Sequence, residues 1–338
     1  MAPLRVAITG ANGFIGSALC ASMRDAGWLV REITRQQKSR YLPHDSVDFV
    51  ANGLGRADFV DAVGVGDIDG STDWAHTLRD CDVVVHLAAH QTATRQSSAQ
   101  ADLAFERVNA LGTLNLAKQA AASGVKRFVL LSTVKIHGEA TPPSSTWIEA
   151  SPPNPQSLYS QSKYRAEMAL IAAAAVSAME WVVVRPPMVY GPGHQASNIR
   201  SLVRWVELGV PLPLGLVRNQ RSIIALPNLI DFILLCAVHP NAANQTFLVS
   251  DGCDISVREL VQKIAAFSCR PVKLVPVPIS LLKICSAFVG QAGLVQRLTG
   301  NLQVDISKAK ELLEWRPPYT VEDGLQYFLR GEIDKKVV

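Results

Sequence analysis

Residues 9–16 read Thr9-Gly10-Ala11-Asn12-Gly13-Phe14-Ile15-Gly16, and they follow a short apolar run at residues 5–9. Glycines at this spacing allow a tight turn, a close approach of the backbone to a pyrophosphate, and close packing of the following helix on the strand. The first amides of that helix attract anions. Glycines mark many turns, but their place between a strand and a helix predicts a dinucleotide-binding loop. We expect Asn12, Phe14 and Ile15 to contact the cofactor.

The first half of the chain repeats this alternation of strand and helix, which is typical of a parallel sheet covered by helices. Strands are predicted at residues 5–9, 30–34, 82–87, 127–132 and 181–185, and a weaker one near 59–65. Helices are predicted at residues 14–26, 102–123 and 159–175. Residues 140–155, with five prolines, are expected to form a loop near the site that could be mobile.

After residue 186, short helices alternate with loops and brief strands. We therefore predict an α/β protein with a doubly wound Rossmann domain over residues 1–186. A smaller C-terminal α/β domain over residues 187–330 is expected to bind the substrate, and residues 331–338 form a tail.

Composition excludes several classes of protein. The 338 residues are 48% hydrophobic and 18% charged, with a formal net charge of +4, which suits a globular enzyme. Lysines and arginines are scattered, so no nucleic-acid partner is expected. The apolar stretches at 168–184 and 223–238 are too short or interrupted to span a membrane. Six dispersed cysteines without a C-x-x-C pair indicate reduced thiols in the cytoplasm, and no histidine has metal-ligand spacing.

The choice of dinucleotide depends on the end of the second predicted strand, where NAD sites usually carry Asp or Glu. Thr34 and Arg35 stand there, with Lys38 and Arg40 close behind. A guanidinium can bind a 2′-phosphate through two hydrogen bonds, so NADP(H) is favoured over NAD(H). Glu32 would reverse this preference if the register of the strand differed.

A tyrosine and a lysine form the predicted catalytic pair. Tyr159 and Lys163 are four residues apart, on one face of a predicted helix. A phenol has a pKa of about 10, and a neighbouring ammonium together with the positive nicotinamide ring is expected to lower the pKa of Tyr159 toward a useful range. The preceding strand ends at Ser132 and Thr133. Thr133 is expected to bind the substrate oxygen, whereas Ser132 either supports it or only caps the strand.

Together these residues resemble the extended short-chain dehydrogenase/reductase superfamily, in the branch similar to UDP-glucose 4-epimerase. The resemblance extends to residues 86–89 (His-Leu-Ala-Ala), 108–113 and 185–193. The resemblance implies that Asp67 and Ile68 flank the adenine. The other cofactor-binding residues that it implies, besides the glycine loop and the catalytic pair, are Leu87, Ala88, Ala89, Asn109, Ser132, Pro186, Pro187 and Val189.

The same resemblance places a nucleotide-diphosphate site at Asn198, at Pro211, Leu212 and Pro213 beside the uracil, and at Arg221. From the residues alone, Arg221 either binds a phosphate or is solvated. Lys135 likewise either reaches the substrate or faces solvent.

Residues 132–139, 219–223 and 246–252 look closer to bacterial surface-polysaccharide enzymes that reduce a UDP-4-keto-6-deoxy-N-acetylhexosamine. Three departures from the epimerase pattern, Lys135, His137 and Asn228, put epimerase chemistry in doubt. The missing acidic residue after the second strand also favours a reductase, since a reductase must release its cofactor.

We therefore expect NADPH-dependent reduction at C4 of a UDP-linked (N-acetyl)hexose in O-antigen or other surface-polysaccharide biosynthesis, by a homodimer. The alternatives are a UDP-sugar 4-epimerase, a reductase of a hydrophobic ketone, and a non-catalytic dinucleotide sensor.

Overall fold

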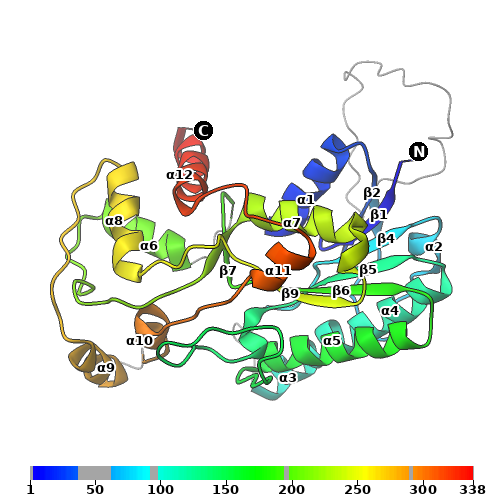
Figure 1. Ribbon diagram of the computed structural model, residues 1–338, viewed down its shortest axis with the longest axis horizontal. Coiled ribbons are helices and arrows are strands. Elements are labelled where there is room, and N and C mark those ends of the chain that lie inside the picture. Colours follow the sequence, from blue (N-terminus) through cyan, green and yellow to red (C-terminus); the bar gives the residue numbers. More distant parts are fainter. Residues whose placement is uncertain (1–2, 37–61, 92–97, 194–197, 289–291, 338) are drawn as a thin grey trace. The chain divides into compact units, whose positions relative to one another are not determined.

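The computed structural model describes residues 3–36, 62–91, 98–193, 198–288 and 292–337 (Figure 1). The chain forms two units: residues 1–131 with 162–182, and residues 132–161 with 183–338. Helix α5 (Leu158–Ala175) and strand β6 (Glu180–Arg185) each begin in one unit and end in the other. The predicted roles of residues 1–186 and 187–330 stay a prediction.

The first unit is built on a parallel sheet. In it β1 (Arg5–Thr9) pairs with β2 (Leu29–Thr34) on one side and with β4 (Val83–His86) on the other. Outside them lie β3 (Ala62–Gly64) and β5 (Arg127–Leu131), and the full strand order is β3-β2-β1-β4-β5-β6-β9. All four residues of β4 are buried, because helices cover both faces of such a sheet.

This strand order makes the chain change direction across the sheet at β1, between β1 and β4. Ligands of doubly wound folds bind at the carboxyl ends of the strands at such a point. Figure 1 shows α1 (Phe14–Asp25) above the sheet and α4 (Gly112–Ala122) below it. The predicted Rossmann fold is therefore confirmed, with the glycine loop at the switch point.

The helix predicted at residues 102–123 is three consecutive segments. α3 (Ser98–Phe105) leads into a π-helical turn, η1 (Glu106–Leu111), and then into α4. The wide turn carries Asn109, whose buried side chain accepts from the backbone N of His90 at 2.7 Å and donates to its O at 3.0 Å. A period of 3.6 in the sequence cannot reveal this extra residue, because the turn depends on a partner outside the helix.

The second unit has its own small sheet and helical core. β7 (Met188–Tyr190) and β8 (Ile223–Ala225) run parallel, and α6 (Asn198–Glu207), α8 (Val257–Phe267) and α12 (Val321–Val337) pack together. The remaining elements of the chain are α2 (Ala75–Leu78), η2 (Val134–Ile136), α7 (Leu226–Val238), η3 (Pro240–Ala242), β9 (Gln245–Leu248), α9 (Ile279–Phe288), α10 (Ala292–Thr299) and α11 (Ser307–Leu312).

Local sequence explains where α8 begins. The Ser256 hydroxyl accepts from the Glu259 amide at 3.0 Å, and the Glu259 carboxylate accepts from the Ser256 amide at 2.9 Å. This reciprocal cap satisfies two amides that a helix start leaves unpaired.

The proline-rich segment 140–155 is tied down. Trp147 accepts from Asp305 N at 2.9 Å and donates its own amide to Gln303 O at 2.9 Å, and Thr141 N donates to Asn301 O at 3.0 Å. Backbone pairing of this kind does not suit a freely moving loop. In the described ranges, no helix has the length and apolar character needed to cross a bilayer.

Candidate functional site

The glycine loop folds tightly against the segment that follows β4. Gly10 has φ +71°, and a Cβ on it would lie 2.9 Å from the backbone nitrogen of Ala88. Gly13 N donates to Gly10 O at 2.9 Å, and a Cβ on Gly16 would collide with that same oxygen. Only glycine fits at positions 10 and 16, so the loop exposes backbone where a pyrophosphate would approach.

The start of α1 also fits a dinucleotide. Gly13 occupies the N-cap and has no side chain with which to cap the helix. Asn12 is exposed and Phe14 and Ile15 are half-buried. Because no side chain caps the start of α1, its first backbone amides can bind an anion, so these residues suit the pyrophosphate of NAD or NADP.

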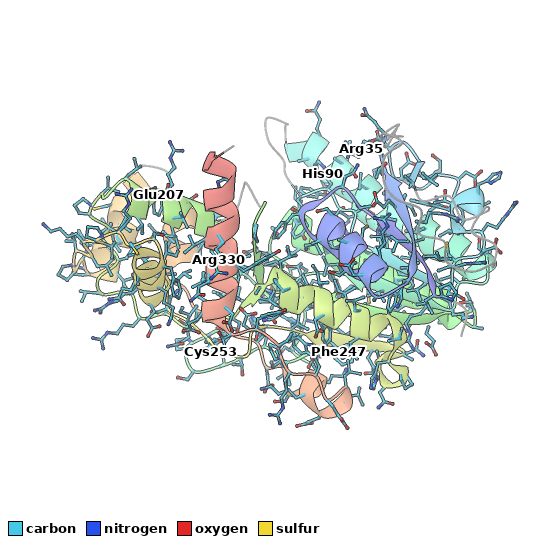
Figure 2. All side chains as sticks on the ribbon, turned by 90° about the horizontal axis from the view of Figure 1, so that it is seen from above. Arg35, His90, Glu207, Phe247, Cys253 and Arg330 are labelled. Carbon is cyan, nitrogen blue, oxygen red and sulfur yellow. The ribbon has the colours of Figure 1, made fainter. Side chains whose placement is uncertain are left out.

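The charges after β2 overturn one expectation. Arg35 follows β2 (Figure 2), and its Nε lies 3.3 Å from Asp67 Oδ1. Arg107 Nη2 lies 3.6 Å from the other oxygen of Asp67. The end of β2 carries no carboxylate, but Asp67 brings one to Arg35 from a distant part of the chain, so the predicted preference for NADP(H) is not supported. Glu32 instead pairs with Arg24 at 2.7 Å, and Lys38 and Arg40 lie outside the described residues.

Further residues expected at the cofactor lie in the same unit. Ile68 packs on the start of α4, where a Cβ on Gly112 would lie 2.8 Å from Ile68 Cγ2. Leu87, Ala88 and Ala89 are half-buried in the segment after β4. These positions adjoin the carboxyl ends of β1, β2 and β4.

Helix α5 carries the predicted catalytic pair. Lys163 and Glu167 are buried and Tyr159 is half-buried, and the three follow one another at intervals of four residues along one helix face. Burial lowers the pKa of Lys163 to about 8, although Glu167 opposes this shift. The carboxylate of Glu167 is thus the internal counter-charge of the lysine.

For the protein by itself, the pKa of Tyr159 lies above that of a free phenol. Burial raises it to about 12, because phenolate loses more hydration than phenol does. The predicted lowering depends on the positive nicotinamide ring as well as on Lys163, so it stays a prediction.

Two hydroxyls follow β5. Thr133 caps the short helix η2, since its Oγ1 accepts from Lys135 N at 3.3 Å, and this leaves its proton for another acceptor. Ser132 Oγ is buried and has no hydrogen-bond partner among the described residues. A buried hydroxyl without a partner among the described residues fits a ligand contact, so the supporting role predicted for Ser132 stays a prediction.

The nicotinamide-pocket candidates adjoin these hydroxyls within the second unit. Pro186 O accepts from Val134 N at 3.0 Å, and Val184 O accepts from Ser132 N at 2.7 Å. Pro187 is buried, and Val189 lies opposite Ile224 in the β7–β8 pair. The backbone thus holds residues 184–189 beside Ser132 and Thr133.

The charged candidates for substrate binding form a small group. Lys135 Nζ pairs with Glu139 at 2.8 Å. Arg221 Nη1 donates to Gly300 O at 3.0 Å, and its pKa is lowered by burial while Glu139 opposes the shift. Neither cation is simply a solvated side chain, because each already has a protein partner.

Of the residues expected beside the uracil, one is buried in the core and the others lie at the surface. Leu212 is buried and exchanges backbone hydrogen bonds with Lys273 at 2.9 Å and Val275 at 2.8 Å, whereas Pro211 and Pro213 are exposed. Asn198 begins α6, and its side chain lies outside the described part. Leu212 therefore contributes to the core, and its neighbours remain candidates for a ligand contact.

Two features of the site escaped the sequence interpretation. Glu167 could have been found by extending the Tyr-Lys spacing one further turn. Glu139, between two cations, had no local signal. Over the described ranges, no cluster of three or more His, Cys, Asp or Glu side chains is arranged to hold a metal ion.

Comparison with known proteins agrees with this geometry. The sequence profile of the NAD dependent epimerase/dehydratase family matches residues 6–250. A UDP-glucose 4-epimerase from Vibrio cholerae is 41% identical over 325 residues, which cover 96% of this chain and 94% of the relative.

Solved structures share the fold. MoeE5 in complex with UDP-glucose and NAD superposes with a TM-score of 0.74 at 23% identity, covering 98% of this chain and 99% of that one. A UDP-glucuronic acid 4-epimerase from Bacillus cereus in complex with NAD gives a TM-score of 0.75 at 19% identity, covering 99% of both chains. The chain therefore belongs to the NAD dependent epimerase/dehydratase family and is an enzyme of the extended short-chain dehydrogenase/reductase type.

Proposed function

We propose that this protein is an NAD-dependent UDP-sugar 4-epimerase that interconverts UDP-glucose and UDP-galactose. The observation that carries the proposal is the 41% identity, over nearly the whole chain, to a protein named UDP-glucose 4-epimerase. Net reduction of a 4-keto sugar, expected from the sequence, becomes the second candidate.

The departures that argued against an epimerase have structural explanations. His137 Nε2 accepts from Arg185 at 3.0 Å, and its ring stacks on Trp147 at 5.7 Å. Asn228 is buried and donates to Asp251 at 2.7 Å and to Tyr319 O at 2.9 Å. Lys135 is paired with Glu139. These side chains support local packing, so their identity does not count against chemistry at C4.

The proposed cofactor is NAD. Asp67 places a negative charge beside Arg35, where a 2′-phosphate would otherwise bind, and repulsion between like charges disfavours NADP. Gly10, Gly13 and Gly16 would hold the pyrophosphate. Held there, NAD would supply reversible hydride transfer at C4 of the sugar, and return of the hydride to the opposite face of the C4 ketone would invert that centre.

The protein's own residues would move the proton. Tyr159 would take the proton of the C4 hydroxyl as the hydride leaves and donate it back to the same oxygen in the second half-reaction. Its pKa of about 12 favours the donating step. The Lys163 ammonium would stabilise phenolate in the accepting step, and the Thr133 hydroxyl would donate to the C4 oxygen.

The decisive experiment is a redox-neutral assay. The protein is incubated with UDP-glucose and NAD, and UDP-galactose is measured by chromatography while absorbance at 340 nm (reduced nicotinamide) is followed. An epimerase forms the product without net change in absorbance. Stoichiometric consumption of NADPH with a UDP-4-keto sugar, and no UDP-galactose, would establish the reductase instead.

Tyr159→Phe tests the assigned chemistry. Removing the phenolic proton should lower turnover by about 10²–10⁴-fold, while NAD affinity changes little. Tyr164→Phe, on the same helix, is the matched control and should keep full activity. Equal activity of Tyr159→Phe and the control would instead favour a non-catalytic dinucleotide sensor.

We also propose that the protein is a homodimer. Four large apolar side chains of the first unit are exposed: Leu103 at 71%, Leu111 at 45%, Met168 at 41% and Val176 at 88%. Covering them with a second copy would remove apolar surface from water. Light scattering should give twice the chain mass, and Leu103→Lys with Met168→Lys should give a monomer. An unchanged mass for that variant would exclude this surface.

A further inference from the structure

A buried histidine at the end of β4 lies between two threonines of the first unit. His86 is 1% exposed, and its Nδ1 lies 2.6 Å from Thr9 Oγ1. Its Nε2 lies 3.0 Å from Thr113 Oγ1. The ring therefore joins the end of β1 to the start of α4.

The direction of these hydrogen bonds follows from the threonine at one end. Thr113 Oγ1 lies 2.6 Å from the backbone oxygen of Asn109, which can only accept. The single hydroxyl proton of Thr113 is used there, so His86 must donate from Nε2. A neutral ring then accepts at Nδ1, and Thr9 is its donor.

The hydrogen bonds at the Thr9 end of this chain of hydrogen bonds agree with this assignment. Thr9 Oγ1 accepts a hydrogen bond from the Ala88 amide at 3.2 Å, and its hydroxyl donates a hydrogen bond to Nδ1 of His86. From the Ala88 amide through Thr9, His86 and Thr113 to the backbone oxygen of Asn109, each donor thus has one acceptor. A doubly protonated ring could not accept from Thr9, so that hydrogen bond would be lost. Burial, together with the positive charge of Lys163, lowers the pKa of His86 to about 3, so the ring stays neutral.

Both ends of this chain of hydrogen bonds reach candidate site residues. Thr9 and Ala88 flank Gly10, whose missing side chain leaves room for the Ala88 backbone. The side chain of Asn109 donates to Ser162 Oγ at 2.9 Å, and Ser162 precedes Lys163 on α5. His86 thus connects the entry of the glycine loop with the helix that carries the catalytic lysine.

We propose that His86, as the neutral tautomer protonated at Nε2, is a positioning residue that sets the glycine loop and Lys163 in register with each other. This role rests on the proposed function, because it assumes that the loop binds NAD and that Lys163 acts beside it. In this role His86 acts through Thr9, Thr113 and Asn109.

The test removes one hydroxyl and keeps the shape of the site. Thr113→Val is close in volume, but it leaves Nε2–H of His86 facing a methyl group. Thr113→Ser restores the hydroxyl. Leu116→Ala, a fully buried position one turn further along α4, destabilises the same helix without touching the chain. NAD affinity is measured by calorimetry after bound nucleotide has been removed, with the thermal midpoint alongside.

We expect Thr113→Val to weaken NAD binding by about 10-fold or more, because small displacements in a binding site have large effects. Thr113→Ser should bind within about twofold of the unaltered protein, and so should Leu116→Ala despite a lower thermal midpoint. His86→Leu should behave like Thr113→Val if it folds.

Wild-type NAD affinity in Thr113→Val, or an equal loss in Leu116→Ala, would overturn the positioning role. Failure of Thr113→Ser to restore binding would also overturn it. A protein that binds NAD in this pattern but converts no UDP-sugar would leave the role intact and refute the proposed 4-epimerase.

Discussion

Asp67 lies beside Arg35, where we propose that it selects between NAD and NADP. The two side chains are 3.3 Å apart and both are largely exposed, so their attraction is modest, but a 2′-phosphate would meet the carboxylate as well as the guanidinium. The proposed preference for NAD thus depends on a residue far along the chain, which the end of β2 does not reveal.

Asp67→Asn should therefore shift the cofactor preference toward NADP. Loss of the negative charge frees Arg35 for a 2′-phosphate, and we expect the ratio of NADP to NAD affinity to rise by about 10-fold. Glu32→Gln is the control, since Glu32 pairs with Arg24 and should leave the ratio unchanged. A shift in the control and none in Asp67→Asn would mean that Glu32 is the discriminating residue.

The hydroxyl of Thr133 belongs to the same scale. Thr133→Val should lower turnover by about 10²-fold, as expected when a donor to a developing oxyanion is removed. Thr133→Ser keeps the donor and should retain most of the activity. Steady-state kinetics with UDP-glucose would distinguish the two, and equal losses would show that the hydroxyl of Thr133 is not needed for turnover.

At the level of elements, β1, the glycine loop and α1 together form the proposed cofactor-binding turn. The loop is tight because Gly16 packs its backbone against Gly10 O, and the following helix starts without a side-chain cap. Its geometry leaves no room for a methyl group.

Gly16→Ala should accordingly weaken NAD binding by about 10-fold or more, since the added Cβ forces two backbone segments apart. Gly293→Ala, in α10 with open space around the added atom, should bind NAD normally. Calorimetric titration of both variants is the measurement. Normal binding by Gly16→Ala would exclude this loop as the cofactor cradle.

Element boundaries were predicted well where one residue type repeats. The predicted strands at 5–9, 30–34, 82–87, 127–132 and 181–185 each lie within a residue of the observed ends, because buried β-branched runs specify a strand locally. The π-helical turn was missed, since His90 lies outside the helix that it shapes. The strand predicted near residues 59–65 is seen only as Ala62–Gly64, and residues 59–61 lie outside the described part.

For the whole molecule, two buried histidines link stability to pH. An unfolded histidine takes up a proton near pH 6.5, whereas burial lowers the pKa of His86 to about 3 and that of His137 to about 4. The folded state therefore has its full stability above pH 6.5, where both histidines are neutral in the folded and unfolded protein. It loses stability as the pH falls from 6.5 toward 4 and 3, because only the unfolded protein takes up protons there. His86 belongs to the first unit and His137 to the second, so both should weaken in acid.

Each histidine should reduce the free energy of unfolding by about 1.4 kcal/mol at pH 5.5 relative to neutral pH. Urea unfolding at pH 7.5 and pH 5.5 measures the loss. His86→Gln should show a smaller loss than the unaltered protein, and His76→Gln, at an exposed position, should show the same loss. Identical pH dependence in all three proteins would contradict the assignment.

Local sequence was enough for the glycine loop, the parallel strands and the spacing of Tyr159 and Lys163. Each of these depends on residues a few positions apart, through backbone sterics, alternating burial or one helical turn. The sequence could not predict that Asp67 would oppose Arg35, that His86 would bridge two threonines, or that the pKa of Tyr159 would rise. These depend on which distant segments meet and on how much water their meeting removes, and only the folded chain sets both.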